Sequence, residues 1–208
     1  RQELGLPKEG FVFACFNNNY KYLPETFDSW MRIMQATPKS ILFLYADNEW
    51  VQSNLIQEAE IRGIHKDRVI FGKRLPTKEY LARYKVCDLF LDTYPYNAGT
   101  TASDALWAGL PIITMMGESF ASRVAASLLK AIELPELITS TRKEYEDLAI
   151  DLATNPKKLA HIKNKLTVNR SSAQLFNTPL FAKNIESAYK MMHAREQKAL
   201  PLEDIYIQ

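Results

Sequence analysis

The sequence predicts an α/β domain in which helices cover both faces of a parallel sheet. Short apolar runs alternate with segments whose apolar residues recur at helical spacing. The short runs are apolar throughout and lack the polar alternation of a strand that faces water. With 208 residues, 47% of them hydrophobic, the chain is large and apolar enough for one packed domain.

The first half of the chain supplies five expected strands with helices between them. The expected strands are residues 11–15, 41–45, 69–71, 89–91 and 112–115. The expected helices are residues 24–35, 54–63, 77–85 and 101–108. Thr77 is a suitable capping residue for the third helix, and Gly63 is a suitable end for the second.

The second half is mostly helical. We expect helices at residues 120–132, 142–154, 156–168 and 180–196, with a short edge strand at 137–138. The chain therefore divides into a sheet-containing lobe, residues 1–178, and a C-terminal helix with its tail, residues 179–208.

Composition excludes several classes of function. A net charge of only +2 gives no basic field for nucleic acid. No apolar stretch approaches the roughly 20 residues that cross a bilayer, and we expect no signal peptide. Cys15 and Cys87 lie in apolar runs, so we expect reduced core thiols and a cytoplasmic protein. The chain begins with Arg1 in place of Met, and we expect a piece of a longer protein.

The most informative stretch is residues 88–109, DLFLDTYPYNAGTTASDALWAG, which indicates a strand, a turn-rich loop and a helix start. Free N–H groups and a partial positive charge make a helix N-terminus suitable for phosphate. Thr100 and Thr101 can cap this helix or donate to phosphate oxygens, and Asp104 is close enough for a ribose hydroxyl. A capped crossover helix without a ligand explains the same geometry.

A second motif, FNNNYK at residues 16–21, follows the first strand. A reaction that expels a nucleoside diphosphate builds negative charge on the leaving oxygen, which the ammonium of Lys21 can neutralise. The amide of Asn18 can add a neutral contact. A surface lysine among turn-forming asparagines is the alternative interpretation.

The long stretch resembles the nucleotide-sugar loop of the protein O-GlcNAc transferase family, which includes the SPINDLY-like group and bacterial-type homologues. The shared pattern is D-T-x-x-x-N-x-x-T-T-x-x-D-x-L-W-x-G. It is formed here by Asp92, Thr93, Asn97, Thr100, Thr101, Asp104, Leu106, Trp107 and Gly109. The likeness extends over residues 10–177, which makes it far more specific than a single glycine-rich loop.

The resemblance implies a Rossmann-like lobe, the C-terminal donor-binding half of a GT-B glycosyltransferase. It implies metal-independent, inverting transfer of N-acetylglucosamine from UDP-GlcNAc to Ser or Thr of a protein. It also implies a second lobe across a cleft and an upstream tetratricopeptide (TPR) array that presents acceptor proteins. We expect no cofactor and no metal, no activity from this lobe alone, and no partner in nucleic acid or membrane.

The resemblance also implies roles for particular residues. Lys21 is the catalytic residue at the diphosphate. Donor-binding roles fall on Asn18, Leu75, Tyr80, Arg83, Thr100, Thr101 and Asp104. Among these, the Leu75 backbone reads uracil, and Tyr80 and Arg83 lie near the nucleoside. Tyr80 and Gly99 stand where the family often has His, and Thr77 stands in place of its ribose-binding lysine.

Three other interpretations stay open. The SPINDLY-like branch implies a GDP-fucose donor and protein O-fucosyl transfer. A nucleotide-sugar 2-epimerase would share the fold but needs acid and base groups that the motifs lack. A non-catalytic scaffold lobe would bind partners only. We further expect Asp92 and Asn97 to shape the loop, Arg123 to pair with a scaffold carboxylate, and no histidine to serve as general base.

Overall fold

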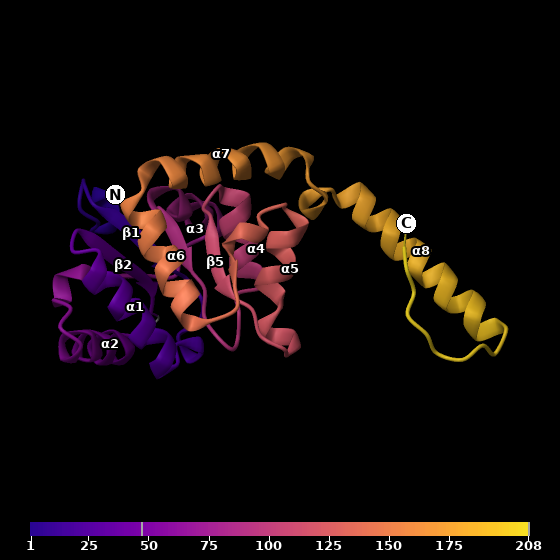
Figure 1. The fold of residues 1–208 in the computed structure, drawn as a ribbon, viewed down its shortest axis with the longest axis horizontal. Helices are drawn as coiled ribbons and strands as arrows, with labels where there is room; N and C mark the ends of the chain where they lie inside the picture. Colours follow the sequence, from indigo (N-terminus) through magenta and orange to yellow (C-terminus); the bar gives the residue numbers. More distant parts are fainter. Residues whose placement is uncertain (47, 208) are drawn as a thin grey trace.

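The computed structural model describes residues 1–46 and 48–207; Asp47 and Gln208 lie outside the described residues. A six-stranded sheet forms its centre, which confirms the predicted α/β class (Figure 1). Its strands are β1 (Phe11–Cys15), β2 (Ser40–Tyr45), β3 (Val69–Gly72), β4 (Leu89–Leu91), β5 (Ile112–Met115) and β6 (Ile138–Thr139).

All neighbouring strands are parallel, and their order is β3-β2-β1-β4-β5-β6. The chain starts in the middle of the sheet, builds outward to β3 and then returns to place β4 beside β1. Phe13 of β1 pairs with Leu89 of β4. The loops that leave these two strands diverge, which opens a crevice at the carboxyl edge of the sheet.

The helices connect the strands and cover the sheet. They are α1 (Pro24–Ala36), α2 (Glu49–Ile61), α3 (Thr77–Arg83), α4 (Thr100–Ala108), α5 (Val124–Ala131), α6 (Arg142–Thr154), α7 (Pro156–Ser172) and α8 (Thr178–Gln197). Helices α1, α2 and α6 lie on one face, and α3, α4 and α5 lie on the other (Figure 1). Large side chains such as Trp30, Phe43 and Phe90 are fully buried between these layers.

Several predicted helix boundaries were wrong. Helix α2 starts five residues early because the Asn48 side chain accepts a hydrogen bond from the Val51 N–H at 2.9 Å. Thr77 does not cap α3, since Pro76 holds that position and no side chain accepts there. The long helix expected after residue 119 is divided, with a 3-10 turn at Phe120–Ser122 before α5.

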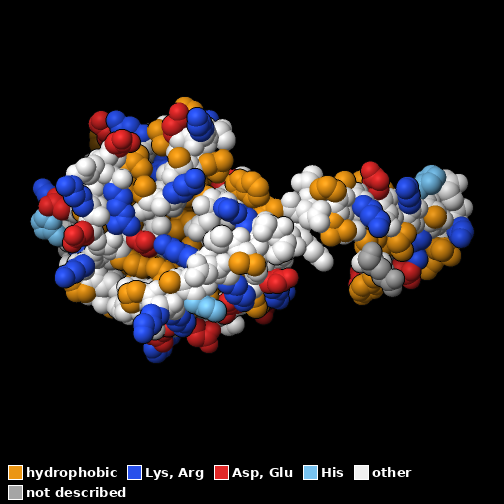
Figure 2. Space-filling model, turned by 90° about the horizontal axis from the view of Figure 1, so that it is seen from above, with side chains coloured by type: hydrophobic (Ala, Val, Ile, Leu, Met, Phe, Trp, Pro, Cys, Tyr) orange, Lys and Arg blue, Asp and Glu red, His pale blue; other side chains and the backbone are white. Residues whose placement is uncertain are grey.

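Helix α8 projects from the body of the molecule (Figure 1). None of its residues is buried. Figure 2 shows hydrophobic side chains between the charged ones along this projecting part. Among the helices of the described residues, none is both long enough and apolar enough for a membrane crossing.

The carboxylate of Asp92, at the end of β4, joins several elements inside the core. Its Oδ1 accepts the backbone N–H groups of Thr93 (2.8 Å) and Ala98 (2.7 Å), and its Oδ2 accepts the Thr114 hydroxyl (2.7 Å). The Asp92 carbonyl accepts the hydroxyl of Tyr145 from α6 at 2.9 Å. Burial raises the pKa of Asp92 to about 7, and the hydrogen bonds donated to its carboxylate act against that rise.

The hydroxyl of Tyr145 provides a test of this core network. It donates to Asp92 and accepts the Trp30 indole N–H at 3.2 Å, so Tyr145→Phe leaves two buried polar groups unpaired. We expect the free energy of unfolding to fall by roughly 1–3 kcal/mol in urea denaturation. The matched control is Tyr189→Phe on α8, where the ring is exposed. Equal stability of the two variants would contradict the assignment.

The raised pKa of Asp92 predicts a dependence of stability on pH. Between the ordinary value of 3.8 and about 7, the folded protein holds a proton that the unfolded chain releases. Stability therefore falls as the pH rises through this window. Asp92→Asn preserves the shape of the side chain without the titration. We expect the difference in unfolding free energy between the two proteins to change by roughly 4 kcal/mol across the window. A constant difference would refute the prediction.

Candidate functional site

One buried side chain, the amide of Asn17, joins the two sides of the crevice between the loops that follow β1 and β4. Its Nδ2 donates to the Thr93 hydroxyl at 2.8 Å, and its Oδ1 accepts the Thr101 hydroxyl. The loop after β1, the loop after β4 and the start of α4 are thus tied at one point. Asn18, the neighbour of Asn17 and a residue predicted to contact the donor, is exposed. The sequence contained a feature that could have identified Asn17: it is a polar residue just after a buried strand, where an amide must find partners inside the protein.

The N-terminus of α4 opens at this edge of the sheet. The N–H groups of Ala102 and Ser103 donate to the Gly99 carbonyl, at 3.1 and 3.0 Å. The first turn therefore leaves the N–H groups of Thr100 and Thr101 for an outside acceptor. Neither threonine hydroxyl caps the helix, because Gly99 holds the N-cap position and the Thr101 hydroxyl donates to Asn17. An anion here would meet backbone donors and the exposed Thr100 side chain.

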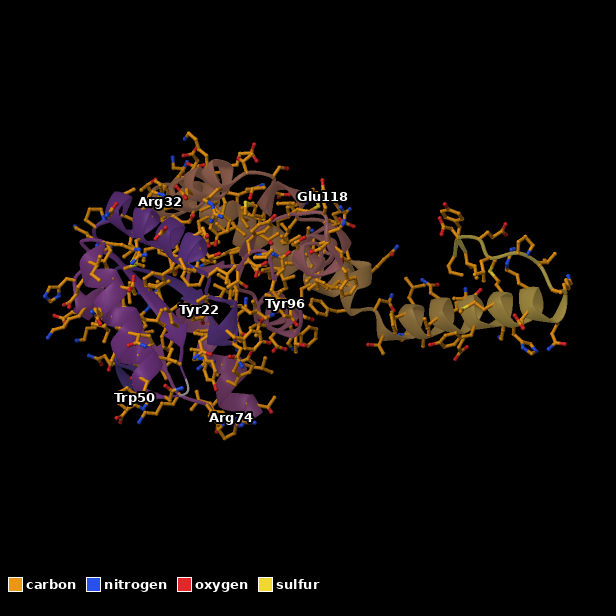
Figure 3. All side chains as sticks on the ribbon, turned by 90° about the horizontal axis from the view of Figure 1, so that it is seen from below. Tyr22, Arg32, Trp50, Arg74, Tyr96 and Glu118 are labelled. Atoms are coloured by element: carbon orange, nitrogen blue, oxygen red, sulfur yellow. The ribbon has the colours of Figure 1, made fainter. Side chains whose placement is uncertain are left out.

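Lys21 lies across the crevice from this helix end. Its Nζ donates to the Asn97 carbonyl at 3.0 Å and sits 3.7 Å from the centre of the Tyr96 ring. Burial lowers the pKa of Lys21 from its ordinary value, while the Asp92 carboxylate acts in the opposite direction. Figure 3 labels Tyr96 and also Tyr22, the residue that follows Lys21, both in the body of the molecule.

Lys21 and Thr100 line one pocket of about 360 Å³, which we call the Lys21 pocket. Its other lining residues are Tyr96, Asn97, Gly99, Phe120, Ala121 and Val124. A cation and a helix N-terminus thus face the same cavity, which is a suitable environment for a diphosphate. No carboxylate and no histidine is among these lining residues.

Tyr80 and Asp104 form a second polar group, where α3 packs against α4. The Tyr80 hydroxyl is hydrogen-bonded to the Tyr84 hydroxyl and interacts with the Asp104 carboxylate. Burial raises the pKa of Tyr80 to about 12. Burial also raises the pKa of Asp104, and the hydrogen bond from Tyr80 lowers it. The half-buried carboxylate is held in place by its neighbour on α3.

Arg83 lies inside the protein and does not face the crevice, with only 3% of its surface exposed. Its guanidinium lies 3.9 Å from the centre of the Phe16 ring, and Nη1 donates to the Lys73 carbonyl at 3.1 Å. Its Nε has no partner among the described residues. Burial lowers the pKa of Arg83. A Cβ at Gly72 would lie 2.7 Å from Nη1, so a larger residue here would force the guanidinium to move.

The predicted site residues therefore divide into separate groups. Lys21 and Thr100 share the Lys21 pocket, with Thr101 beside them. Tyr80 and Asp104 share the contact between α3 and α4. Asn18, Leu75 and Arg83 belong to neither group: Asn18 is exposed, Leu75 is half-buried in the loop before α3, and Arg83 is buried.

The structural roles predicted for the loop are confirmed for Asp92 and Asn97, whose side chains bond to backbone groups of the loop itself. The prediction for Arg123 was wrong. Its guanidinium donates to the Gly117 carbonyl at 3.4 Å, and no ion pair of Arg123 occurs in the described part of the chain. Because the side chain is exposed, solvation replaces a carboxylate partner.

The described residues contain no cluster of three or more His, Cys, Asp or Glu side chains that could hold a metal ion. Cys15 and Cys87 are free, buried thiols, as predicted. Burial raises the pKa of Cys87 to about 12, and it raises the pKa of Cys15 further, so both thiols stay protonated. The chemistry available at the crevice is therefore that of a lysine, backbone N–H groups, hydroxyls and one carboxylate.

Comparison with solved structures places this fold among those of glycosyltransferases. A mutant of the Thermobaculum terrenum O-GlcNAc transferase superposes with a TM-score of 0.84 at 34% identity, covering 90% of this chain and 37% of that one. WaaG, a glycosyltransferase of lipopolysaccharide biosynthesis, superposes with a TM-score of 0.65 at 17% identity, covering 89% of this chain and 49% of that one. The second likeness shows the fold alone. The lobe is thus one half of a GT-B fold.

Comparison with curated protein sequences leads to the same group of enzymes. The Caenorhabditis elegans UDP-N-acetylglucosamine–peptide N-acetylglucosaminyltransferase is 35% identical over 99% of this chain and 18% of its own length. The probable Arabidopsis thaliana enzyme SEC, of the same description, is 37% identical over 92% of this chain and 20% of its own length. The chain thus spans about a fifth of these relatives. A family model matches residues 1–185, and the chain belongs to glycosyl transferase family 41.

Proposed function

We propose that this chain is the donor-binding lobe of a protein O-GlcNAc transferase that uses UDP-GlcNAc. The observation that carries the proposal is the Lys21 pocket, where a lysine and the N-terminus of α4 face one cavity at the point where strand order reverses. The C. elegans and Arabidopsis relatives are named as UDP-N-acetylglucosamine–peptide N-acetylglucosaminyltransferases, the second as a probable one, which supports the choice of sugar donor and of a peptide acceptor.

In the proposed reaction, a Ser or Thr hydroxyl of the acceptor attacks the anomeric carbon from the face opposite UDP. The bond from that carbon to the β-phosphate oxygen breaks, and UDP leaves with the bonding electron pair, which inverts the configuration. Lys21 and the N–H groups of Thr100 and Thr101 neutralise the charge that develops on UDP. These groups supply the positive charge that a metal ion provides in other transferases, so we propose metal-independent transfer.

We propose that the remaining residues hold the nucleoside. Asp104, positioned by Tyr80, accepts a ribose hydroxyl, and the Leu75 backbone reads uracil. Arg83 lies 5.1 Å from the Tyr80 ring centre and acts as a positioning residue beneath it. Asn18, exposed at the mouth of the crevice, makes a second contact with the diphosphate.

The acceptor base and the acceptor protein lie outside this lobe in our proposal. A second lobe closes the cleft, and an upstream TPR array presents the acceptor. The base is a group of that lobe or a phosphate oxygen of the donor. This lobe by itself is then expected to bind donor without transferring sugar.

Lys21→Ala tests the pocket directly. Removal of one charge-assisted contact should weaken UDP binding to this chain by about 10- to 100-fold in isothermal titration calorimetry. In the full-length protein, turnover should fall by roughly a hundredfold or more. Lys8→Ala, which removes an exposed lysine outside the pocket, is the matched control. Unchanged affinity for UDP and unchanged turnover in the Lys21 variant would contradict the proposed role of Lys21.

Thermal unfolding with UDP, GDP and UDP-GlcNAc, with and without a chelator, tests the donor class. We expect uridine ligands alone to stabilise the chain, by about 2.7 kcal/mol at 100 times the dissociation constant, without any effect of chelator. A preference for GDP would favour the fucosyltransferase alternative. A shift that the chelator abolishes would refute metal independence.

We further propose that α8 and the tail, residues 179–208, pack on the second lobe. The support is that no residue of α8 is buried here. Even its aromatic side chains Phe181 and Tyr189 each expose more than half of their surface. The paired change Phe181→Ser with Tyr189→Ser should leave the melting temperature of this chain unchanged. It should lower that of the full-length protein by several degrees, about the effect of losing two buried aromatic rings. An equal effect on both proteins would exclude the packing.

A further inference from the structure

A second cavity, of about 470 Å³, lies between α3, α4 and α7, and we call it the Trp107 groove. Its lining residues are Lys78, Leu81, Ala82, Lys85, Trp107, Ala108 and Arg170. It shares no lining residue with the Lys21 pocket. The reaction proposed above uses none of these side chains.

The floor of the Trp107 groove is apolar and fixed. Trp107 is 53% exposed, although large aromatic rings are usually covered in a folded domain. The Phe176 ring packs against it in an edge contact at 5.1 Å between centroids. The Arg170 guanidinium lies 5.9 Å from the Trp107 ring and donates to the Trp107 carbonyl at 2.8 Å. The ring is therefore held in one place while half of its surface stays available for stacking.

The rim of the groove is basic. Lys78, Lys85 and Arg170 surround the apolar floor, and no acidic side chain is among the lining residues. Lys78 and Lys85 make no ion pair or side-chain hydrogen bond in the described portion of the chain. An anionic partner would relieve the mutual repulsion of these cations and would displace little existing structure.

We propose that the Trp107 groove docks an acidic segment of a partner protein. An apolar side chain of the segment stacks on Trp107, and carboxylates on either side pair with the basic rim. Lys78 and Lys85 are seven residues apart along α3 and the turn after it, about 11 Å on a helix axis. Successive side chains of an extended chain point to opposite faces, so residues two and four positions apart share one face, and four residues span about 13 Å. The matching segment thus carries two glutamates four positions apart, with an apolar residue midway between them on the same face.

The shape of the groove favours a peptide over other anionic partners. Its cations border a recessed apolar floor, whereas a nucleic acid needs a row of cations that follows its phosphates. A lipid surface is flat and does not fill a groove of about 470 Å³. Alternating carboxylate and apolar side chains satisfy both the floor and the rim.

A short fluorescein-labelled peptide containing Glu-Ser-Phe-Ser-Glu, which places both glutamates and the phenylalanine on one face when extended, tests the proposal by fluorescence anisotropy with this chain. We expect saturable binding that weakens as salt is raised, and no binding of the peptide with lysines in place of its glutamates. Trp107→Ala, and Lys78→Ala combined with Lys85→Ala, should each weaken binding by about tenfold or more. Saturating UDP should leave peptide binding unchanged, so failure of the donor proposal and failure of this one are separable.

The matched controls are Trp50→Ala, which removes another exposed indole, and Lys8→Ala combined with Lys39→Ala. Both should bind the peptide as the unaltered chain does, and circular dichroism should confirm that all variants fold. Absence of peptide binding would overturn the proposal, as would equal binding by the Trp107 variant. Tighter binding of anionic vesicles or of a single-stranded oligonucleotide than of the peptide would overturn it in favour of that partner.

Discussion

The buried carboxylate of Asp92 is the interaction on which the rest of the crevice depends. It stands where β4 ends, directly beside β1, and it accepts hydrogen bonds from its own loop and from β5. A loop that leaves a parallel strand has no neighbouring strand to pair with, so its N–H groups need other acceptors. One carboxylate supplies them, and the path of the chain from β4 to α4 follows from those bonds.

The position of the Lys21 ammonium depends on the same loop. Lys21 donates to the Asn97 carbonyl, and the Asn97 amide in turn donates to the Thr93 carbonyl at 2.8 Å. The lysine is thus placed by the loop after β4, although it belongs to the loop after β1. A diphosphate would exchange a neutral carbonyl partner for an anionic one, which is the stronger hydrogen bond. The lysine is therefore held beside the N-terminus of α4 by neutral protein groups.

Helix α4 links the two surfaces that we assign. Its first residue, Thr100, lines the Lys21 pocket, and Trp107, one residue before its end, forms the floor of the Trp107 groove. The backbone N–H groups serve the first site and an exposed side chain serves the second, so one rigid element positions both. A partner protein held at the groove would lie on the same lobe as the donor, at a fixed offset from it.

The sequence by itself determined the strands, most of the helices and the family, because apolar periodicity is local and the ordered Asp92 to Gly109 motif is contiguous. It also located the edge of the sheet at which the site lies. Only the tertiary structure decided that Asn17 is buried in place of Asn18, that the Thr101 hydroxyl pairs inside the protein, and that Arg83 lies beneath Tyr80. The Asn17 bonds join residues more than 70 positions apart, and Arg83 packs on the rings of Phe16, which follows β1, and of Phe43 in β2. Each contact therefore depends on how the strands associate and not on neighbouring sequence.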